Sequence, residues 1–185
     1  MYRPFIAQLL YEHIRMRRVL RVVEHQLDRA ETFEQPDLAL LRRALEYLRG
    51  LPARMHHTRE DLLFERLALV DPSMSQELRI LSEQHQELLQ LEDDFLEMVD
   101  TAARTGQAGL PRLLYYGRHY LSVQKSHAKQ EETAVFPKAT SVLTAAAWTL
   151  LDRPLLDERH PAMDAESQSR VLSLYRQLME QAKAA

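Results

Sequence analysis

The chain has 185 residues and a formal net charge of −3, with 45% hydrophobic and 28% charged residues. Because it has only four glycines and no cysteine, the composition argues against an all-β barrel or sandwich and excludes disulfides and thiolate metal ligands. Charges of both signs are interspersed, so we expect no binding to nucleic acid. No apolar stretch is long enough to span a bilayer, and no signal-type apolar core opens the chain. We therefore expect a helical cytoplasmic protein that does not bind membranes.

Apolar residues recur at the three- and four-residue spacing of an amphipathic helix in four successive segments. These segments cover about residues 6–27, 38–67, 78–99 and 113–136. The breaks between them are short and polar. Since short connections place consecutive helices side by side and antiparallel, the pattern predicts an all-α, up-down-up-down four-helix bundle.

Three local signals indicate where the helices are interrupted or end. Gly50-Leu51-Pro52 should kink or interrupt the second helix. Ser73 and Gln76 are spaced as a capping box, which predicts that Ser73 caps the start of the third helix. The fourth helix is expected to end near Phe136-Pro137.

The remaining residues form a second part of the expected organisation. We assign the bundle to residues 1–137 and a helical extension to residues 138–185. The extension should hold a short helix over 138–151, a loop over 152–164 and a final amphipathic helix over 165–182. Its apolar faces are expected to pack on the bundle or to meet a partner, for example a second copy of the chain in a homodimer.

The apolar seam of each of the four segments is interrupted by a histidine, and two of these histidines are followed four residues later by a glutamate. Such a pair stacks on one face of a helix. The six residues are His13, His56, Glu60, His85, His127 and Glu131. Counted from the helix connections at about 1.5 Å per residue, they lie within roughly one turn of a common level. We therefore expect them to meet in one layer of the core.

Two carboxylates buried together among leucines are strongly disfavoured unless cations neutralise them. Four imidazoles and two carboxylates form a nitrogen and oxygen donor set that suits two divalent metal ions, with iron first and manganese or zinc as alternatives. If both glutamates bridge, positions remain for an oxo or hydroxo bridge and for an exogenous ligand. The residues thus predict a metal centre that is open to a small molecule.

The order of these residues is a lone histidine, then His56-x-x-x-Glu60, a second lone histidine and His127-x-x-x-Glu131. With the flanking stretches 11–15, 56–64, 83–85 and 127–137, this order resembles the hemerythrin-like (HHE cation-binding) domain. The resemblance covers about residues 5–137. It implies a non-haem di-iron centre in a four-helix bundle, with the six residues named above as the metal ligands.

Two differences separate the chain from oxygen-carrying hemerythrins. Those carriers have a second histidine one turn further along the third helix, where this chain has Leu89, and a differently spaced aspartate in the fourth helix, where it has Glu131. The chain also lacks the cysteine-bearing N-terminal segment of relatives that repair iron–sulfur clusters. We therefore expect a protein that binds and reacts with, or senses, a small oxidant or diatomic such as dioxygen, nitric oxide or peroxide.

Other functions stay open from the sequence. The chain could be a metal-responsive sensor or interaction module that signals through its C-terminal helices, or it could bind or store iron without redox turnover. Whether it is an enzyme is also open. Ferritin-like carboxylate centres are excluded because they need Glu-x-x-His pairs, and no histidine here has a glutamate three residues before it.

The roles of three further residues are undecided. His57 with Asp61 is a rival to His56 with Glu60, and we favour the latter pair because Glu60 continues the apolar seam and matches the family motif. His57 is then a candidate for an outer partner of the centre.

Tyr120 precedes His127 by two turns, and Glu92 follows His85 by two turns. Tyr120 is expected to be a packing residue or to bond the site. Glu92 is a spare ligand, a proton relay or the solvated end of the core.

Overall fold

The computed structural model describes residues 3–32, 34–152 and 165–184, and the regular structure within these ranges is helical, without a strand. The long helices are α1 (Pro4–Glu31), α2 (Leu38–Arg49), α3 (Leu51–Val70), α4 (Ser75–Thr105), α5 (Leu110–Gln130) and α8 (Ala165–Ala184). The short elements are η1 (Pro72–Met74), η2 (Gly106–Gly109), η3 (Glu131–Val135), α6 (Phe136–Val142) and α7 (Ala145–Asp152).

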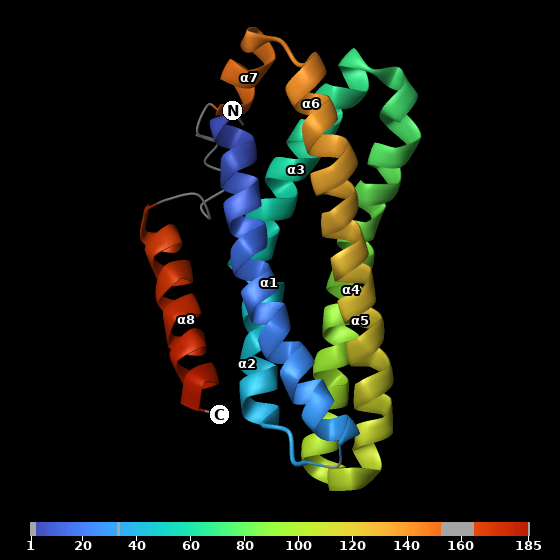
Figure 1. Cartoon of the computed structure of the whole chain (residues 1–185), viewed down its shortest axis with the longest axis vertical. Coiled ribbons are helices and arrows are strands. Elements are labelled where there is room, and N and C mark those ends of the chain that lie inside the picture. Colours follow the sequence, from blue (N-terminus) through green and yellow to red (C-terminus); the bar gives the residue numbers. More distant parts are fainter. Residues whose placement is uncertain (1–2, 33, 153–164, 185) are drawn as a thin grey trace.

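Four antiparallel rods make up the bundle (Figure 1). They are α1, α2 continued by α3, α4, and α5 continued by η3 and α6. α1 packs against α2 and α5, and α4 packs against α2, α3 and α5. The predicted all-α bundle with additional C-terminal helices is confirmed.

The break in the second rod lies where the sequence predicts it, because Gly50 separates α2 from α3. The predicted capping box at Ser73 is wrong. A short 3₁₀ turn over Pro72–Met74 precedes α4, and the Asp71 carboxylate accepts the hydrogen bond from the backbone N–H of Ser73 at 3.2 Å. Asp71 therefore caps the turn, which moves the start of α4 to Ser75.

The fourth rod does not end at Phe136-Pro137, contrary to the prediction. A π-helical turn over Glu131–Val135 connects α5 to α6, which reaches Val142. Proline has no N–H to donate and its ring clashes with the preceding turn, so the wider π turn accommodates Pro137 without ending the rod.

The extension contains more breaks than the sequence predicts. The expected helix over 138–151 is divided between α6 and α7, because the hydroxyl of Thr144 accepts a hydrogen bond from the N–H of Ala147 at 3.3 Å and starts a new helix. α7 covers one end of the bundle with buried Trp148, and α8 lies along α2 and α3 with buried Val171. Most of the loop predicted over 152–164 lies outside the described residues.

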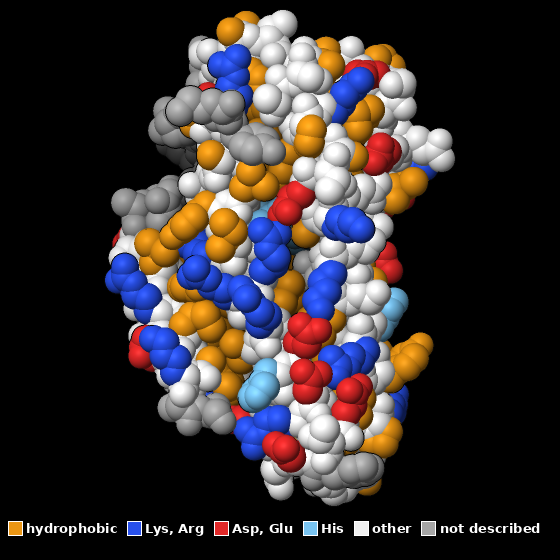
Figure 2. All heavy atoms as spheres, viewed as in Figure 1, with side chains coloured by type: hydrophobic (Ala, Val, Ile, Leu, Met, Phe, Trp, Pro, Cys, Tyr) orange, Lys and Arg blue, Asp and Glu red, His pale blue; other side chains and the backbone are white. Residues whose placement is uncertain are grey.

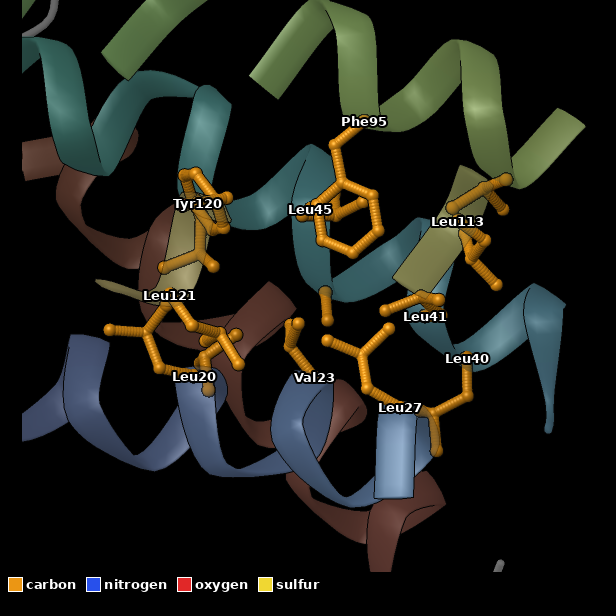
Figure 3. Close-up of a cluster of buried hydrophobic side chains, with 14 of the residues drawn as sticks. Leu20, Val23, Leu27, Leu40, Leu41, Leu45, Phe95, Leu113, Tyr120 and Leu121 are labelled. Atoms are coloured by element: carbon orange, nitrogen blue, oxygen red, sulfur yellow. The ribbon is translucent and has the colours of Figure 1, made fainter. Parts of the chain in front are cut away.

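The apolar core consists of two clusters, one toward each end of the bundle. One fills the half that contains α2, where Leu27, Leu45 and Phe95 are fully buried (Figure 3). There α5 approaches so closely that a Cβ on Gly117 would lie 2.7 Å from the side chains of Leu27 and Phe95. The other cluster is formed around Ile6, α6 and α7. The polar layer described below lies between the two clusters.

Among the described helices, none is by itself long and apolar enough to cross a membrane. One pair, Pro72–Val142 with Ala145–Asp152, meets that criterion by length and composition when it is taken together, and it is bent by 119°.

Candidate metal centre

The structure brings the six residues predicted from the sequence into one buried layer. Each of the four rods supplies at least one of them, and every one is at most 4% exposed: His13, His56, Glu60, His85, His127 and Glu131. The two histidine–glutamate pairs close within their own helices, with Nε2 to Oε1 distances of 3.0 Å and 3.1 Å. Convergence of the side chains is thus observed, and their role as ligands stays a prediction.

The two carboxylates also join the rods to one another. Nε2 of His13 lies 3.4 Å from an oxygen of Glu60 and 3.4 Å from an oxygen of Glu131. Nε2 of His85 lies 3.5 Å from Glu60 and 3.9 Å from Glu131. Each carboxylate therefore faces imidazoles from three helices.

These atoms are arranged like ligands of a metal ion rather than like hydrogen-bond partners. Both oxygens of Glu60 and of Glu131, and Nε2 of His85 and of His127, are buried and have no hydrogen-bond partner within the described part of the chain. Leaving so many polar atoms unsatisfied is costly. Two ligands at right angles on one ion, with bonds of about 2.1 Å, are about 3.0 Å apart, which is close to the observed spacing. The donor set therefore fits bound metal.

Donor atoms that lie within 4.8 Å of one another form two groups, and Glu60 belongs to both. One group contains His13 and His56, and the other contains His57, His85 and His127. The geometry does not exclude either histidine as a donor, because His56 lies in the layer and belongs to the first group, and His57 belongs to the second. His57 stacks on His85 with ring centroids 4.1 Å apart, so it is either an outer partner or an additional ligand of the second group.

All four layer histidines are oriented by an acceptor that bonds their Nδ1 atom. In each case the acceptor lies on the neighbouring rod, so the contacts close a ring around the bundle. The pairs are Glu12 with His56 at 2.9 Å, Asp61 with His85 at 3.1 Å, Gln84 with His127 at 3.0 Å and Glu132 with His13 at 2.7 Å. Since Nδ1–H donates outward, Nε2 points into the layer.

The role of these four residues as acceptors is not predicted from the sequence, which pairs Asp61 with His57 instead, although a simple signal marks all four. Each one is the sequence neighbour of a layer residue on its own helix. Arg59 and Arg17 in turn contact Glu12 and Glu132, and Ser82 donates to Asp61 at 2.7 Å. The ring is therefore fixed from outside as well as from inside.

Replacing Asp61 by alanine is expected to weaken metal binding by about 10- to 100-fold, the usual cost of losing an outer partner of a ligating histidine. The reason is that His85 loses the acceptor that fixes its ring. Metal affinity is measured by titration against a chelating dye. Exposed Glu65 on the same helix provides the control, Glu65→Ala. Equal affinities for the two variants would show that the Asp61 contact does not orient a ligand.

In the metal-free layer two of the imidazoles, those of His13 and His85, and the two carboxylates hold each other in charged forms. Burial lowers the pKa of His13, but contact with Glu131, Glu132 and Glu60 outweighs it and raises this pKa to about 11. Burial also lowers the pKa of His85, but contact with Asp61 and the two layer glutamates outweighs it and raises this pKa to about 11. Burial and Glu60 raise the pKa of Glu131, yet contact with three histidines lowers it to about 2.

Metal binding near pH 7 is therefore expected to release at least two protons per chain, because an imidazole must lose its second proton to ligate through Nε2. His13 and His85, with pKa values of about 11, are protonated in the metal-free layer. Glu131, with a pKa of about 2, is already ionised and releases none. Affinity should fall as pH falls, since protons compete for the same nitrogens. Proton release is measured with an indicator dye in weak buffer, and uptake or no release would contradict the assignment.

A second buried polar group lies deeper in the core. Glu92 is 1% exposed and Tyr120 is fully buried. The Tyr120 hydroxyl donates to Glu92 at 2.8 Å, and the Gln124 amide donates to Tyr120 at 3.2 Å. Glu92 is in neither donor group, and it is not the solvated end of the core. Burial raises its pKa to about 7, although Tyr120 and Arg49 lower it.

Replacing Glu92 by glutamine is expected to stabilise the protein at pH 8 by about 1–3 kcal/mol and to leave its stability at pH 4.5 nearly unchanged. A pKa of about 7, against an ordinary glutamate value of 4.5, means that between these two pH values the folded chain holds a proton that the unfolded chain has lost. The favourable contribution is complete below pH 4.5 and disappears as pH rises through about 7. Denaturant unfolding at both pH values measures it. Glu97→Gln, at an exposed site of α4, should show no such pH dependence, and a gain for Glu92→Gln that is equal at both pH values would contradict the account.

Comparison with family models supports the geometric interpretation. Residues 5–139 match the model of the hemerythrin HHE cation-binding domain. No match is found among curated proteins, and none among solved structures. The matched segment contains all six layer residues and the four acceptors that orient the histidines. The chain therefore belongs to the hemerythrin HHE cation-binding family.

Proposed function

We propose that the chain is a cytoplasmic non-haem di-iron protein that binds and reacts with, or senses, a small oxidant or diatomic such as dioxygen, nitric oxide or peroxide. The observation that carries the proposal is the sharing of carboxylates. Glu60 belongs to both donor groups, and Glu131 contacts His13 of one group and His127 of the other. Such sharing is the arrangement expected for two ions bridged by carboxylates, and nitrogen with oxygen donors suits iron, with manganese or zinc as alternatives.

Two bound irons would supply one-electron redox steps and a coordination position for the small ligand. The protein supplies the rest of the chemistry. Glu12, Asp61, Gln84 and Glu132 hold the imidazoles in place, and the two apolar clusters keep bulk water from the layer. A recess of about 220 Å³ between α1 and α5 reaches His13. We propose it as the entrance for the small molecule.

The test is the absorption spectrum of the iron-loaded protein. Ferrous protein is mixed anaerobically with nitric oxide, and separately with dioxygen or hydrogen peroxide. The proposal expects a new visible or near-ultraviolet band with at least one of them, and a return to the starting spectrum on removal of the ligand or on reduction. Iron that exchanges rapidly with a chelator and shows no spectral change with any of the three would favour storage or delivery without redox chemistry.

A second candidate function is favoured by the position of α8. This helix closes a cavity that also contains Glu12, the partner of His56, so a change at the metal could alter how α8 packs. A metal-responsive sensor would use that change to meet a partner or a second copy of the chain. Proteolysis of α8 is compared in ferrous, ferric and metal-free protein. Identical cleavage in the three states would remove this candidate.

A further inference from the structure

A cavity of about 240 Å³ lies between α8 and the bundle, outside the metal layer. Its walls come from α1, α2, α3 and α8, and they combine two arginines with phenol and apolar side chains. Arg15 and Arg59 are the two arginines, and Met55, Val171 and Leu172 are among the apolar residues. The volume lies below the range of about 300–1,000 Å³ that is usual for drug-sized ligands, so an occupant must be small.

Among the described lining residues, Arg15 is the arginine without a carboxylate contact. Glu12, the one carboxylate among the described lining residues, is fully engaged, since one oxygen contacts Gln8 and Arg59 and the other accepts from Nδ1 of His56. Arg15 has no such partner. Its guanidinium lies 5.0 Å from the centre of the Tyr11 ring, and its Nε atom is buried without a hydrogen-bond acceptor in the described part of the chain.

The surface around the opening is also basic. Arginine and lysine side chains gather over α1 between α8 and α5 (Figure 2). Arg15, Arg18 and Arg21 on this helix form no ion pair with any described carboxylate, whereas Arg17 pairs with Glu132. An anion would therefore be attracted to this side of the molecule. Its oxygen atoms would accept a hydrogen bond from the buried Nε–H of Arg15, which lacks an acceptor among the described residues.

We propose that this cavity binds a small organic carboxylate, with its charged group on Arg15 and its apolar body against Met55, Val171 and Leu172. An arginine fork matches the two oxygens of a carboxylate, which favours this class over a neutral ligand. Burial raises the pKa of Tyr47 in the cavity wall to about 12. The phenol therefore stays neutral near pH 7 and adds no competing negative charge.

Binding of a carboxylate in this cavity would affect the packing of α8 and the metal layer. Since Val171 and Leu172 belong to α8, the ligand would stabilise the docking of that helix on the bundle. Since Glu12 bonds His56, the ligand would also change the electrostatic field at one layer histidine. By linkage, any effect of the ligand on metal affinity must equal the effect of metal on ligand affinity. The binding itself does not depend on the proposed di-iron function.

The test uses benzoate as the probe, added to the purified full chain and measured by isothermal titration calorimetry. Benzamide, which has the same shape and no charge, is titrated in parallel. Arg15→Gln removes the proposed partner, and Arg21→Gln removes an exposed arginine of the same helix outside the cavity wall. Circular dichroism verifies that both variants remain folded.

Benzoate is expected to bind the natural chain, and Arg15→Gln should weaken it at least about tenfold, the lower end for a hydrogen bond to a charged group. Arg21→Gln should change affinity less than twofold. Amide hydrogen exchange around Val171 and Leu172 should slow when benzoate is added. No binding at 10 mM benzoate, equal binding of benzamide, or equal effects of the two substitutions would overturn the proposal.

Discussion

Glu60→Gln is expected to remove metal from both positions of the centre, because Glu60 alone among the described residues belongs to both donor groups. A neutral amide is a poorer metal ligand than a carboxylate and cannot bridge two cations as a carboxylate does. The loss of affinity at each position should exceed the about 10- to 100-fold cost of removing an outer partner. Metal per chain is measured after dialysis, and a content below a tenth of the natural value is expected.

The control for this experiment is Glu65→Gln, which changes the same residue type at an exposed position of α3. It should retain the full metal content. If Glu60→Gln lost metal only in part, with one ion retained at its original affinity, Glu60 would belong to a single position. Unchanged metal content in the folded variant would contradict the assignment of Glu60 altogether.

Removing the metal is expected to lower the midpoint of thermal unfolding by about 10 °C or more. Metal bound at a thousandfold excess over its Kd stabilises the folded state by about 4 kcal/mol per site. For a chain of this size each kcal/mol corresponds to about 2–4 °C. The metal-free layer also leaves both oxygens of Glu60 and of Glu131 buried without hydrogen bonds. Scanning calorimetry before and after chelation measures the change.

Two comparisons make that experiment specific. Restoring ferrous iron should recover the original midpoint, and Glu60→Gln should show little response to either chelation or iron. A midpoint that is the same with and without metal would mean that the layer is stable by itself. In that case the histidine and glutamate contacts at 3.0–3.5 Å would have to be ordinary ion pairs.

The level of the layer could be predicted from the sequence because helix geometry is regular. A rise of about 1.5 Å per residue converts distances from the helix connections into heights, and the three short connections between the four rods fix them in register. The heights obtained in this way are little affected by the break at Gly50 and by the π turn over Glu131–Val135. Neither changes the height of a residue by as much as one turn.

Details that depend on contacts between helices could not be predicted in the same way. Periodicity gives the face of a side chain, but it does not say which side chain of a neighbouring helix its polar atoms meet. The sequence therefore pairs Asp61 with His57 rather than with His85, and it does not single out Gln84. From the sequence Glu92 is a spare ligand, a proton relay or the solvated end of the core, and only the packing of α5 against α4 shows that Tyr120 covers it. Helix ends near Asp71 and Thr144 depended on single side chain to backbone hydrogen bonds.

The number of irons per chain tests the central claim most directly. Protein produced with iron and purified without chelators is analysed by plasma mass spectrometry against a concentration from amino-acid analysis. Six converging donors with shared carboxylates predict two irons per chain, and fewer than 0.2 in Glu60→Gln. A folded chain that holds no transition metal, or that holds the same amount after Glu60→Gln, would contradict the claim that the buried layer exists to bind a pair of ions.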